Sequence, residues 1–378
     1  MTDKTKKILK ITGKSVLGVV LALLVIVCGY AIYFVSAFNR IGDTSLTVNK
    51  GDTTDAGINT NQTYNLLSWN VGFCAYSDDY SFFMDGGTES RAFSKKAVED
   101  NLNGITSTYL KIKKDKNLMK NDFDFICYQE VDFDSTRSYR VDIKEELKKS
   151  HLGYSSTFAQ NYDSPYIMIP LTSPHGANNS GLLTLSKYRI QSAQRKELPL
   201  EDSLAKYVDL DRCLSINRIK VDNNKELVLV NIHLSGYSSD GAINITQLKL
   251  LLDICKAEYE KGNYVICAGD FNMDLVDGEG SAGLFGNNSK GENWAQAIDP
   301  AIFEGTGMVK HAPVDKANPV PTCRNAIRPY SEGNSVYIID GFLASQNVLV
   351  LEKSVYDAGF KNSDHNPVIL TFSLARQL

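Results

Sequence analysis

The sequence has no paired cysteine motif. Its seven cysteines contain no Cys-x-x-Cys pair, follow no regular spacing and are odd in number, so no disulfide is expected even if the chain is exported. Cys127 and Cys267 fall in short apolar runs that are typical of central strands, where a thiol behaves as a small hydrophobe. Repeats at solenoid periods and low-complexity tracts are also missing. These absences exclude a disulfide-stabilised miniprotein and a repeat array.

The sequence also has no excess of positive charge. The 378 residues hold 40 Lys and Arg against 44 Asp and Glu, and residues 41–378 hold 34 against 43, a net charge of −9. Because proteins that grip a long nucleic acid by bulk charge are basic, this balance argues against such binding. Hydrophobic residues make up 43% of the chain, which excludes a disordered or collagen-like protein and allows a large core.

Charged residues are missing from residue 15 to residue 38. As a helix this segment would be about 36 Å long, which is enough to cross a hydrocarbon core of about 30 Å. Five lysines precede it, whereas only Arg40 and Lys50 follow closely. The positive-inside rule therefore predicts a cytoplasmic tail over residues 1–14, a transmembrane helix over 15–38 and an extracellular remainder, in a single-pass protein of the cell membrane.

Two other interpretations of this apolar segment stay open. Val35-Ser36-Ala37 has the small residues of a signal-peptide cleavage site, although the segment is longer than the roughly 7 to 15 residues of a signal-peptide core. A buried core helix is disfavoured because lysines cluster at one end of a helix that is apolar all round. Residues 39–62 are rich in Asp, Thr, Asn and Gly without an apolar period, which is typical of a flexible linker. Residues 63–378 are left as one domain.

This domain alternates β-prone runs with helical stretches. Strands are expected at residues 64–69, 123–128, 181–185, 227–232, 264–268, 336–343 and 368–372. In residues 242–261, apolar side chains recur at i+3 and i+4, which predicts an amphipathic helix. The alternation indicates an α/β domain.

Several of the expected strands end in, or adjoin, polar residues that a core does not require. They are Asn70, Glu130, His233, Asp270, Asn272, Asp340, Asp364 and His365. Each alone has an ordinary explanation as a turn, cap or surface residue, but together they share no such explanation. Polar groups at one edge of a sheet can converge on a single site. Carboxylates, amides and histidines together suit Mg²⁺ and a phosphate ester, whereas no Cys or His near either histidine has the spacing of a zinc site.

These residues carry a family resemblance. The segments Trp-Asn, Gln-Glu-Val, Asn-x-His-Leu, Gly-Asp-Phe-Asn, Ile-Asp-x-Phe and Ser-Asp-His-Asn-Pro-Val, in that order, resemble the endonuclease/exonuclease/phosphatase superfamily. That family includes deoxyribonuclease-like nucleases, neutral sphingomyelinases and inositol polyphosphate 5-phosphatases. The resemblance runs from about Tyr64 to Phe372. It implies a four-layer αββα sandwich of two packed mixed β-sheets, and divalent-metal hydrolysis of a phosphodiester or phosphomonoester.

The resemblance also implies roles for the motif residues. Glu130 would bind the metal with Asn70 and Asp364 as supporting ligands, and the metal would be Mg²⁺, with Mn²⁺ or Ca²⁺ as alternatives. His365 would be the catalytic histidine, oriented by Asp340.

The remaining motif residues would handle water and phosphate. Asp270 and Asn272 would orient the attacking water and contact the phosphate, and either Asp270 or His365 would take the water proton. His233 resembles the second histidine of the nuclease, sphingomyelinase and 5-phosphatase branches, which typically is not found in the apurinic-site endonucleases. Candidate substrate-phosphate contacts are Asn179, Arg212 and Arg324, although Arg212 and Arg324 would also fit an ordinary surface position.

The expected function is that of a membrane-anchored, extracytoplasmic phosphodiesterase, acting as a monomer and first of all on nucleic acid. A phospholipid head-group phosphodiesterase is an alternative, because an anchor raises the effective concentration at the bilayer. Tyr80, Phe82 and Phe83 would then be candidates for bilayer insertion, although core packing is commoner for such residues. An inositol phosphate phosphatase is a further alternative. A non-catalytic receptor on the same fold is disfavoured because no motif residue is missing.

Overall fold

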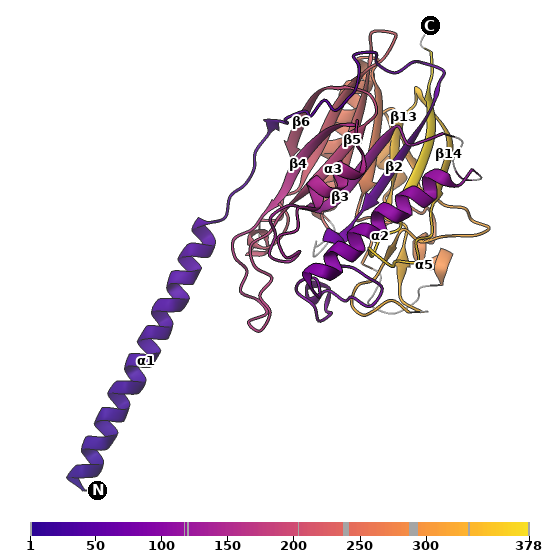
Figure 1. The fold of residues 1–378 in the computed structure, drawn as a ribbon. Coiled ribbons are helices and arrows are strands. Elements are labelled where there is room, and N and C mark those ends of the chain that lie inside the picture. Colours follow the sequence, from indigo (N-terminus) through magenta and orange to yellow (C-terminus); the bar gives the residue numbers. More distant parts are fainter. Residues whose placement is uncertain are drawn as a thin grey trace.

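The computed structural model describes residues 2–116, 118, 121–202, 204–236, 242–286, 294–331 and 333–376. A long helix, α1 (Asp3–Ser36), projects from an α/β domain (Figure 1). It is apolar and long enough to cross a membrane, and the apolar window that qualifies it is not buried against the rest of the protein. This helix matches the apolar segment expected at residues 15–38.

Two mixed β-sheets form the centre of the domain. The six-stranded sheet has the order β14-β15-β2-β3-β5-β4 in the described part of the chain. Its strands are β2 (Thr63–Asn70), β3 (Phe125–Asp132), β4 (Ser155–Asp163), β5 (Asn179–Ser186), β14 (Val348–Val355) and β15 (Val368–Leu374).

The seven-stranded sheet has the order β1-β6-β7-β8-β9-β13-β10 over the same described residues. Its strands are β1 (Thr44–Ser45), β6 (Ile190–Glu197), β7 (Cys213–Lys220), β8 (Glu226–His233), β9 (Tyr264–Asp270), β10 (Met308–His311) and β13 (Asp340–Ser345). A small ribbon of β11 (Cys323–Arg324) and β12 (Val336–Tyr337) lies beside them.

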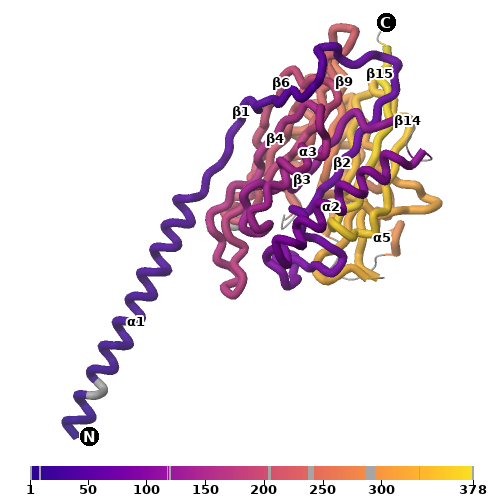
Figure 2. Tube along the Cα trace, in the orientation of Figure 1, coloured from indigo at the N-terminus to yellow at the C-terminus, as the bar shows by residue number. Residues whose placement is uncertain are grey.

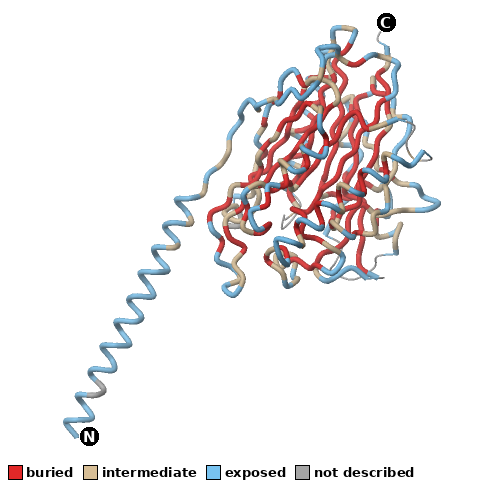
Figure 3. The backbone as a smooth tube through the Cα atoms, viewed as in Figure 1, coloured by how far each residue is buried: buried red, intermediate tan, exposed pale blue. Residues whose placement is uncertain are grey.

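Side chains alternate between two cores because the side-chain period of a strand is two. Tyr64 and Leu66 of β2 face the other sheet, where they belong to one core with Leu229 and Ile266. The intervening side chains, such as Leu67, point outward into a second core. Buried strands appear as the red centre of Figure 3.

Helices cover both outer faces. The side chains of α2 (Lys95–Lys114) and α3 (Ile143–Ser150) pack on the six-stranded sheet, and those of α4 (Ala242–Glu260) pack on the seven-stranded sheet. Strands that are covered on both faces carry continuous apolar runs, which is why the sequence displayed them so clearly. The four-layer αββα sandwich is thereby confirmed. Short helices η1 (Gly72–Cys74), η2 (Phe83–Asp85), η3 (Leu204–Tyr207), α5 (Gly280–Phe285) and η4 (Pro300–Phe303) lie in the connections.

The segment 39–62 differs from the flexible linker that its composition predicts. Strand β1 pairs with β6, Asn49 forms a bridge with Ser156, and the fully buried Ile58 forms a bridge with Val221. The outer strands of a sheet have unpaired backbone groups, and this segment supplies partners for them. Local composition could not reveal this pairing because the partners lie more than a hundred residues away.

Two further expectations are corrected. Tyr80 and Phe82 are buried in the core outside the six-stranded sheet, and Phe83 packs against it, so they do not form a bilayer-inserting hairpin. The run expected as one strand at 336–343 is divided between β12 and β13. The seven cysteines are free thiols, and all of them except Cys28 are buried.

Candidate active site

Strand register places three polar residues in one row. His233 at the end of β8 pairs with Asp270 at the end of the parallel strand β9. Asp340 at the start of the antiparallel strand β13 pairs with the same Asp270. All three side chains are buried. A row of this kind forms because β8 and β9 both end at this edge of the sheet and β13 begins there.

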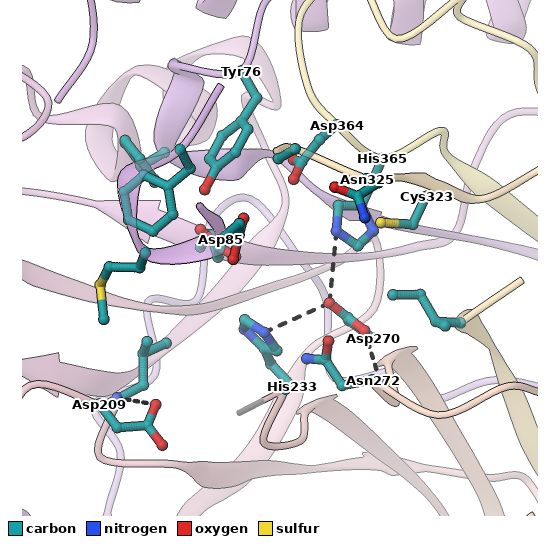
Figure 4. Close-up of a pocket in the computed structure, with 18 of the residues that line it drawn as sticks. Tyr76, Asp85, Asp209, His233, Asp270, Asn272, Cys323, Asn325, Asp364 and His365 are labelled. Atoms are coloured by element: carbon teal, nitrogen blue, oxygen red, sulfur yellow. Dashed lines mark hydrogen bonds and ion pairs between the residues drawn. The ribbon is translucent and has the colours of Figure 1, made fainter. Parts of the chain in front are cut away.

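His365 reaches this row from the other sheet. It forms a bridge with Cys323, and its carbonyl accepts a hydrogen bond of 2.9 Å from Nε1 of Trp69. Its Nδ1 lies 2.8 Å from Oδ2 of Asp340. Nε2 of His365 therefore faces the cavity and lies 3.8 Å from Oδ2 of Asp270. Nε2 of His233 lies 3.5 Å from the same oxygen (Figure 4). Two imidazoles thus converge on one carboxylate oxygen.

Burial shifts the protonation of all three groups. It raises the pKa of Asp270 to about 7, with the nearby Asp340 charge adding to the effect and His365 opposing it. Burial and the Arg212 charge lower the pKa of His233 well below its usual value. Burial also lowers the pKa of His365, but Asp340, Cys323 and Asp364 together outweigh it, so the net shift is upward. Asp270 is thereby brought near neutrality, where a group can exchange its proton in acid-base catalysis.

Glu130 faces this cluster from β3. The register between β3 and β5 shifts between Tyr128 and Val131, and Glu130 has a positive φ of 53°. Such irregularities re-aim a side chain and are typical of functional sites. Nδ2 of Asn70 donates to Oε1 of Glu130 at 3.2 Å and to Oδ2 of Asp270 at 3.1 Å. Asn70 therefore links the two sheets across the site by its amide nitrogen.

The conformation after Asn70 brings Asp364 close. Gly72 donates its N–H to Oδ1 of Asn70 at 3.0 Å and has a φ of 50°. A Cβ atom at Gly72 would lie 2.9 Å from Oδ1 of Asp364, so only glycine fits without displacing that carboxylate. Burial raises the pKa of Asp364 to about 6; the charge of His365 opposes the rise and that of Glu130 adds to it.

Two groups of residues could hold a cation. Glu130, Asp364 and Asp85 line the cavity as neighbouring carboxylates, and their repulsion is what a hard divalent ion relieves. Asp270, Asp340 and His365 also have ligand atoms within 4.8 Å of one another. We favour the group of Glu130, Asp364 and Asp85. In the second group, Nδ1 of His365 and Oδ2 of Asp340 already form a hydrogen bond with each other.

Arg212 has unused hydrogen-bonding capacity in this cavity. Its side chain is buried, its Nη2 lies 3.4 Å from Oδ1 of Asp209, and its Nε and Nη1 have no partner in the part of the chain that the structure describes. Arg324 also lines the cavity, but its Nη2 donates to the carbonyls of Ser77 and Tyr80 at 2.9 and 3.1 Å. Arg324 therefore holds the loop after β2, whereas Arg212 is free to bind an anion.

Asn179 lies outside the cavity. Its Nδ2 donates to the carbonyl of Asp134 at 3.2 Å and its Oδ1 accepts from Gln160 at 2.9 Å. Asn272 does line the cavity, where it has a positive φ of 50° and donates its N–H to Oδ1 of Asp270 at 2.8 Å. The structure thus gathers every predicted site residue around one location except Asn179.

Loops supply cavity walls that the motifs did not reveal. The cavity measures about 340 Å³. Its wall residues outside the motifs include Tyr76, Asp85, Tyr162, His175, Asp209 and Trp294. Except for Tyr162, which lies near the end of β4, they come from connections with no periodic pattern, so the sequence carried no signal for them. Figure 4 shows Tyr76 and Asp85 across the cavity from His233 and Asp270.

The fold and the cluster of polar residues are of the αββα class to which phosphoester hydrolases belong. Residues 67–365 match the model of the Endonuclease/Exonuclease/phosphatase family. The chain belongs to that family, whose members hydrolyse phosphoester bonds. No curated protein matches the chain in sequence.

Solved structures agree on the fold. An endonuclease/exonuclease/phosphatase from Beutenbergia cavernae is 16% identical with a TM-score of 0.55, covering 83% of this chain and 72% of that chain. ANGEL2, a 2',3'-cyclic phosphatase, is 14% identical with a TM-score of 0.52, covering 88% and 99%. The human Nocturnin catalytic domain is 14% identical with a TM-score of 0.51, covering 87% and 97%.

Proposed function

We propose that this chain is a membrane-anchored, divalent-metal-dependent phosphodiesterase. The observation that carries the proposal is the meeting of His233 and His365 at one oxygen of Asp270, beside the carboxylates of Glu130 and Asp364. This arrangement combines acid-base groups with a cation site, as phosphoester hydrolysis requires.

The cation fits the residues that are present. Glu130 and Asp364 would hold it, with Mg²⁺ as the first candidate and Mn²⁺ or Ca²⁺ as alternatives, because their oxygens are hard ligands that repel one another without a cation. When bound, it would supply Lewis-acid stabilisation of a phosphoryl oxygen. Asn70 orients Glu130 through its amide N–H.

The chain's own residues would move the protons. Asp340 holds the proton of His365 on Nδ1, which leaves Nε2 aimed at the cavity. The imidazolium form, favoured by Asp340, would stabilise negative charge on the phosphoryl oxygens. Asp270, with a pKa of about 7, would accept the proton of the attacking water at neutral pH. Arg212 would bind the phosphate through the two nitrogens that have no partner.

The cavity walls favour a single phosphodiester group over a long polynucleotide. Asp85, Glu130, Asp209, Asp270 and Asp364 all line the cavity. A polynucleotide requires cations along its path, whereas the domain is acidic and Arg324 is engaged by backbone carbonyls. We therefore place a phospholipid head group first and nucleic acid second, the reverse of the order that the sequence suggested. One chain supplies every residue of the site, which is consistent with a monomer.

The membrane anchor is the second part of the proposal. The lysines at the start of α1 favour a cytoplasmic N-terminus, and the domain would then lie outside the cell. The uncharged segment 15–38 is longer than the roughly 7 to 15 residues of a signal-peptide core, which supports an uncleaved span over a signal peptide.

The test uses the full chain in phosphatidylcholine and sphingomyelin vesicles. Release of phosphorylated head group is measured with Mg²⁺ and with EDTA, beside parallel assays on single- and double-stranded DNA, RNA and inositol phosphates. We expect Mg²⁺-dependent head-group release that His365→Ala abolishes. Cleavage of nucleic acid alone would reverse the substrate order, and no turnover on any phosphoester would overturn the enzymatic proposal. If protease added to intact cells left the domain uncleaved, the extracellular position of the domain would be contradicted.

A further inference from the structure

The connection between β4 and β5 carries an exposed apolar segment. We refer to residues 164–174 as the apolar loop. It contains no charged residue, and Ile169 and Leu171 are 64% and 78% exposed, while Tyr166 and Met168 are exposed as well. Folded domains seldom leave neighbouring large apolar side chains uncovered unless another surface covers them. The apolar loop is therefore a candidate contact surface.

The apolar loop contacts the last two turns of α1. Oη of Tyr30 donates to the carbonyl of Tyr166 at 2.9 Å and accepts from the N–H of Met168 at 3.2 Å. Oη of Tyr33 accepts from the N–H of Tyr166 at 3.0 Å. Tyrosines near the end of a membrane span are typical of the interfacial aromatic belt. These bonds place the apolar loop at the depth of that belt.

The backbone of the apolar loop is suited to a place with little water. Ile167 exchanges two backbone hydrogen bonds with Gly176, and the carbonyl of Ile169 accepts from the N–H of His175. Pro170 has no N–H to satisfy. An unpaired backbone group is costly in a bilayer, so hydrogen bonds supplied by α1 and by the loop itself favour insertion.

Residues beside the apolar loop form part of the catalytic cavity. Tyr162 precedes the loop, His175 follows it, and both line the cavity. The connection between β6 and β7 also contacts both the region just after α1 and the cavity. The ring of Tyr207 lies 4.9 Å from that of Phe38, and Leu210 lines the cavity. β4 and β6 form the edge of the domain nearest α1 (Figure 1 and Figure 2). The connections that touch the helix are thus also cavity walls.

We propose that the apolar loop is a second membrane contact, which inserts Ile169 and Leu171 into the leaflet where α1 ends and holds the cavity close to the bilayer surface. This inference rests on the proposed membrane span of α1. A lipid bilayer is the occupant we select because the apolar loop is continuous with the lipid-facing end of that span.

Tryptophan placed in the loop tests the proposal. The full chain carrying Leu171→Trp is reconstituted in vesicles of phosphatidylcholine with ordinary or brominated acyl chains, and the emission of the unsubstituted chain is subtracted. Leu152→Trp is the matched control: Leu152 is 83% exposed and precedes β4, whereas Leu171 follows it, so β4 separates them by about 30 Å. We expect blue-shifted emission that brominated lipid quenches for Leu171→Trp, and neither effect for Leu152→Trp.

The outcomes separate the loop from the anchor. A chain that stays in the vesicles through an alkaline wash but shows no quenching at position 171 overturns the membrane contact and leaves the anchor standing. A blue shift without quenching also overturns it, because a protein surface such as a second copy then covers the loop. A chain that does not stay in the vesicles contradicts both proposals. Ile169→Trp repeats the measurement should Leu171→Trp fail to fold.

Discussion

Nδ1 of His365 lies 2.8 Å from Oδ2 of Asp340, and Oδ1 of the same carboxylate has no partner among the described residues. The pair joins the two sheets, because Asp340 begins β13 of one sheet and His365 precedes β15 of the other. The ring is consequently held in one orientation with Nε2 toward the cavity.

We expect His365→Ala to lower kcat by a factor of about 10² to 10³, because the variant loses the imidazolium that would stabilise negative charge on the phosphoryl oxygens. Asp340→Asn should lower kcat as well while changing KM little, since asparagine cannot hold the His365 proton as a carboxylate does. Initial rates over a range of substrate concentrations check this, with thermal unfolding as the control for folding. Full activity in His365→Ala would refute the assignment.

The rise in unfolding temperature that Mg²⁺ causes should distinguish the two candidate cation sites. Mg²⁺ at about 100 times its Kd would stabilise the folded chain by about 2.7 kcal/mol, which raises the unfolding temperature measurably. Glu130→Gln should abolish this rise because it removes a carboxylate ligand, whereas Asp340→Asn should keep it. The opposite pattern would place the cation at Asp270, Asp340 and His365.

Arg212→Gln should weaken phosphate binding. A hydrogen bond to a charged group contributes about 1.5 to 3 kcal/mol, so kcat/KM should fall by about 10- to 100-fold, and inhibition by inorganic phosphate should weaken in parallel. Arg218→Gln is the matched control, because Arg218 pairs with Glu226 and Glu258 away from the cavity. Equal losses in both variants would mean that Arg212 has only a structural role.

The buried His151 should make the fold sensitive to acid. Its Nε2 lies 3.0 Å from Oη of Tyr128, and no described residue is a hydrogen-bond partner of its Nδ1. Burial lowers its pKa to about 4, while Asp122 and Lys113 have smaller, opposing effects. Because the unfolded state binds the proton first, His151 should lower the free energy of unfolding as the pH falls from about 6.5 to about 4, by up to about 3 kcal/mol.

His151→Phe removes this titration, so the variant should lose less stability than the unsubstituted chain between about pH 7.5 and about pH 4.5. Thermal unfolding of the full chain in detergent measures the difference, and the value at the higher pH controls for lost packing against Tyr109 and Tyr128. His175 and His311 also have pKa values lowered by burial to about 4, and they remain in both proteins. Parallel pH profiles would show that His151 does not titrate on unfolding.

The layered fold could be predicted from the sequence to a large extent. Strands buried on both faces, such as β2 and β9, carry apolar runs that stand out from their surroundings. The amphipathic pattern of residues 242–261 became α4, with its end one residue earlier. Segments of lower hydrophobicity were harder: β6 mixes buried and exposed residues and has five charged or amide side chains, and no strand was expected there.

The candidate site was predicted in its chemistry but not in its walls. Motif residues at strand ends lie close together because the pairing register of the strands fixes their neighbours, as it does for His233 and Asp270. Asn179 was expected at the site and lies outside it, because its amide is engaged by Gln160 and Asp134. Tyr76 and Trp294 line the cavity from loops whose paths depend on packing rather than on local pattern.

The sequence by itself determined the apolar span of α1, the alternation of strands and helices, and the set of candidate acid-base and cation-binding residues. These properties follow from local composition and periodicity, which act over a few residues. Only the tertiary structure decided that residues 39–62 pair with strand edges, that Arg212 retains unpaired nitrogens, and that Tyr30 meets Tyr166, 136 residues away in the chain. Such contacts depend on how whole strands and loops pack, because residues so far apart are brought together only by the completed fold.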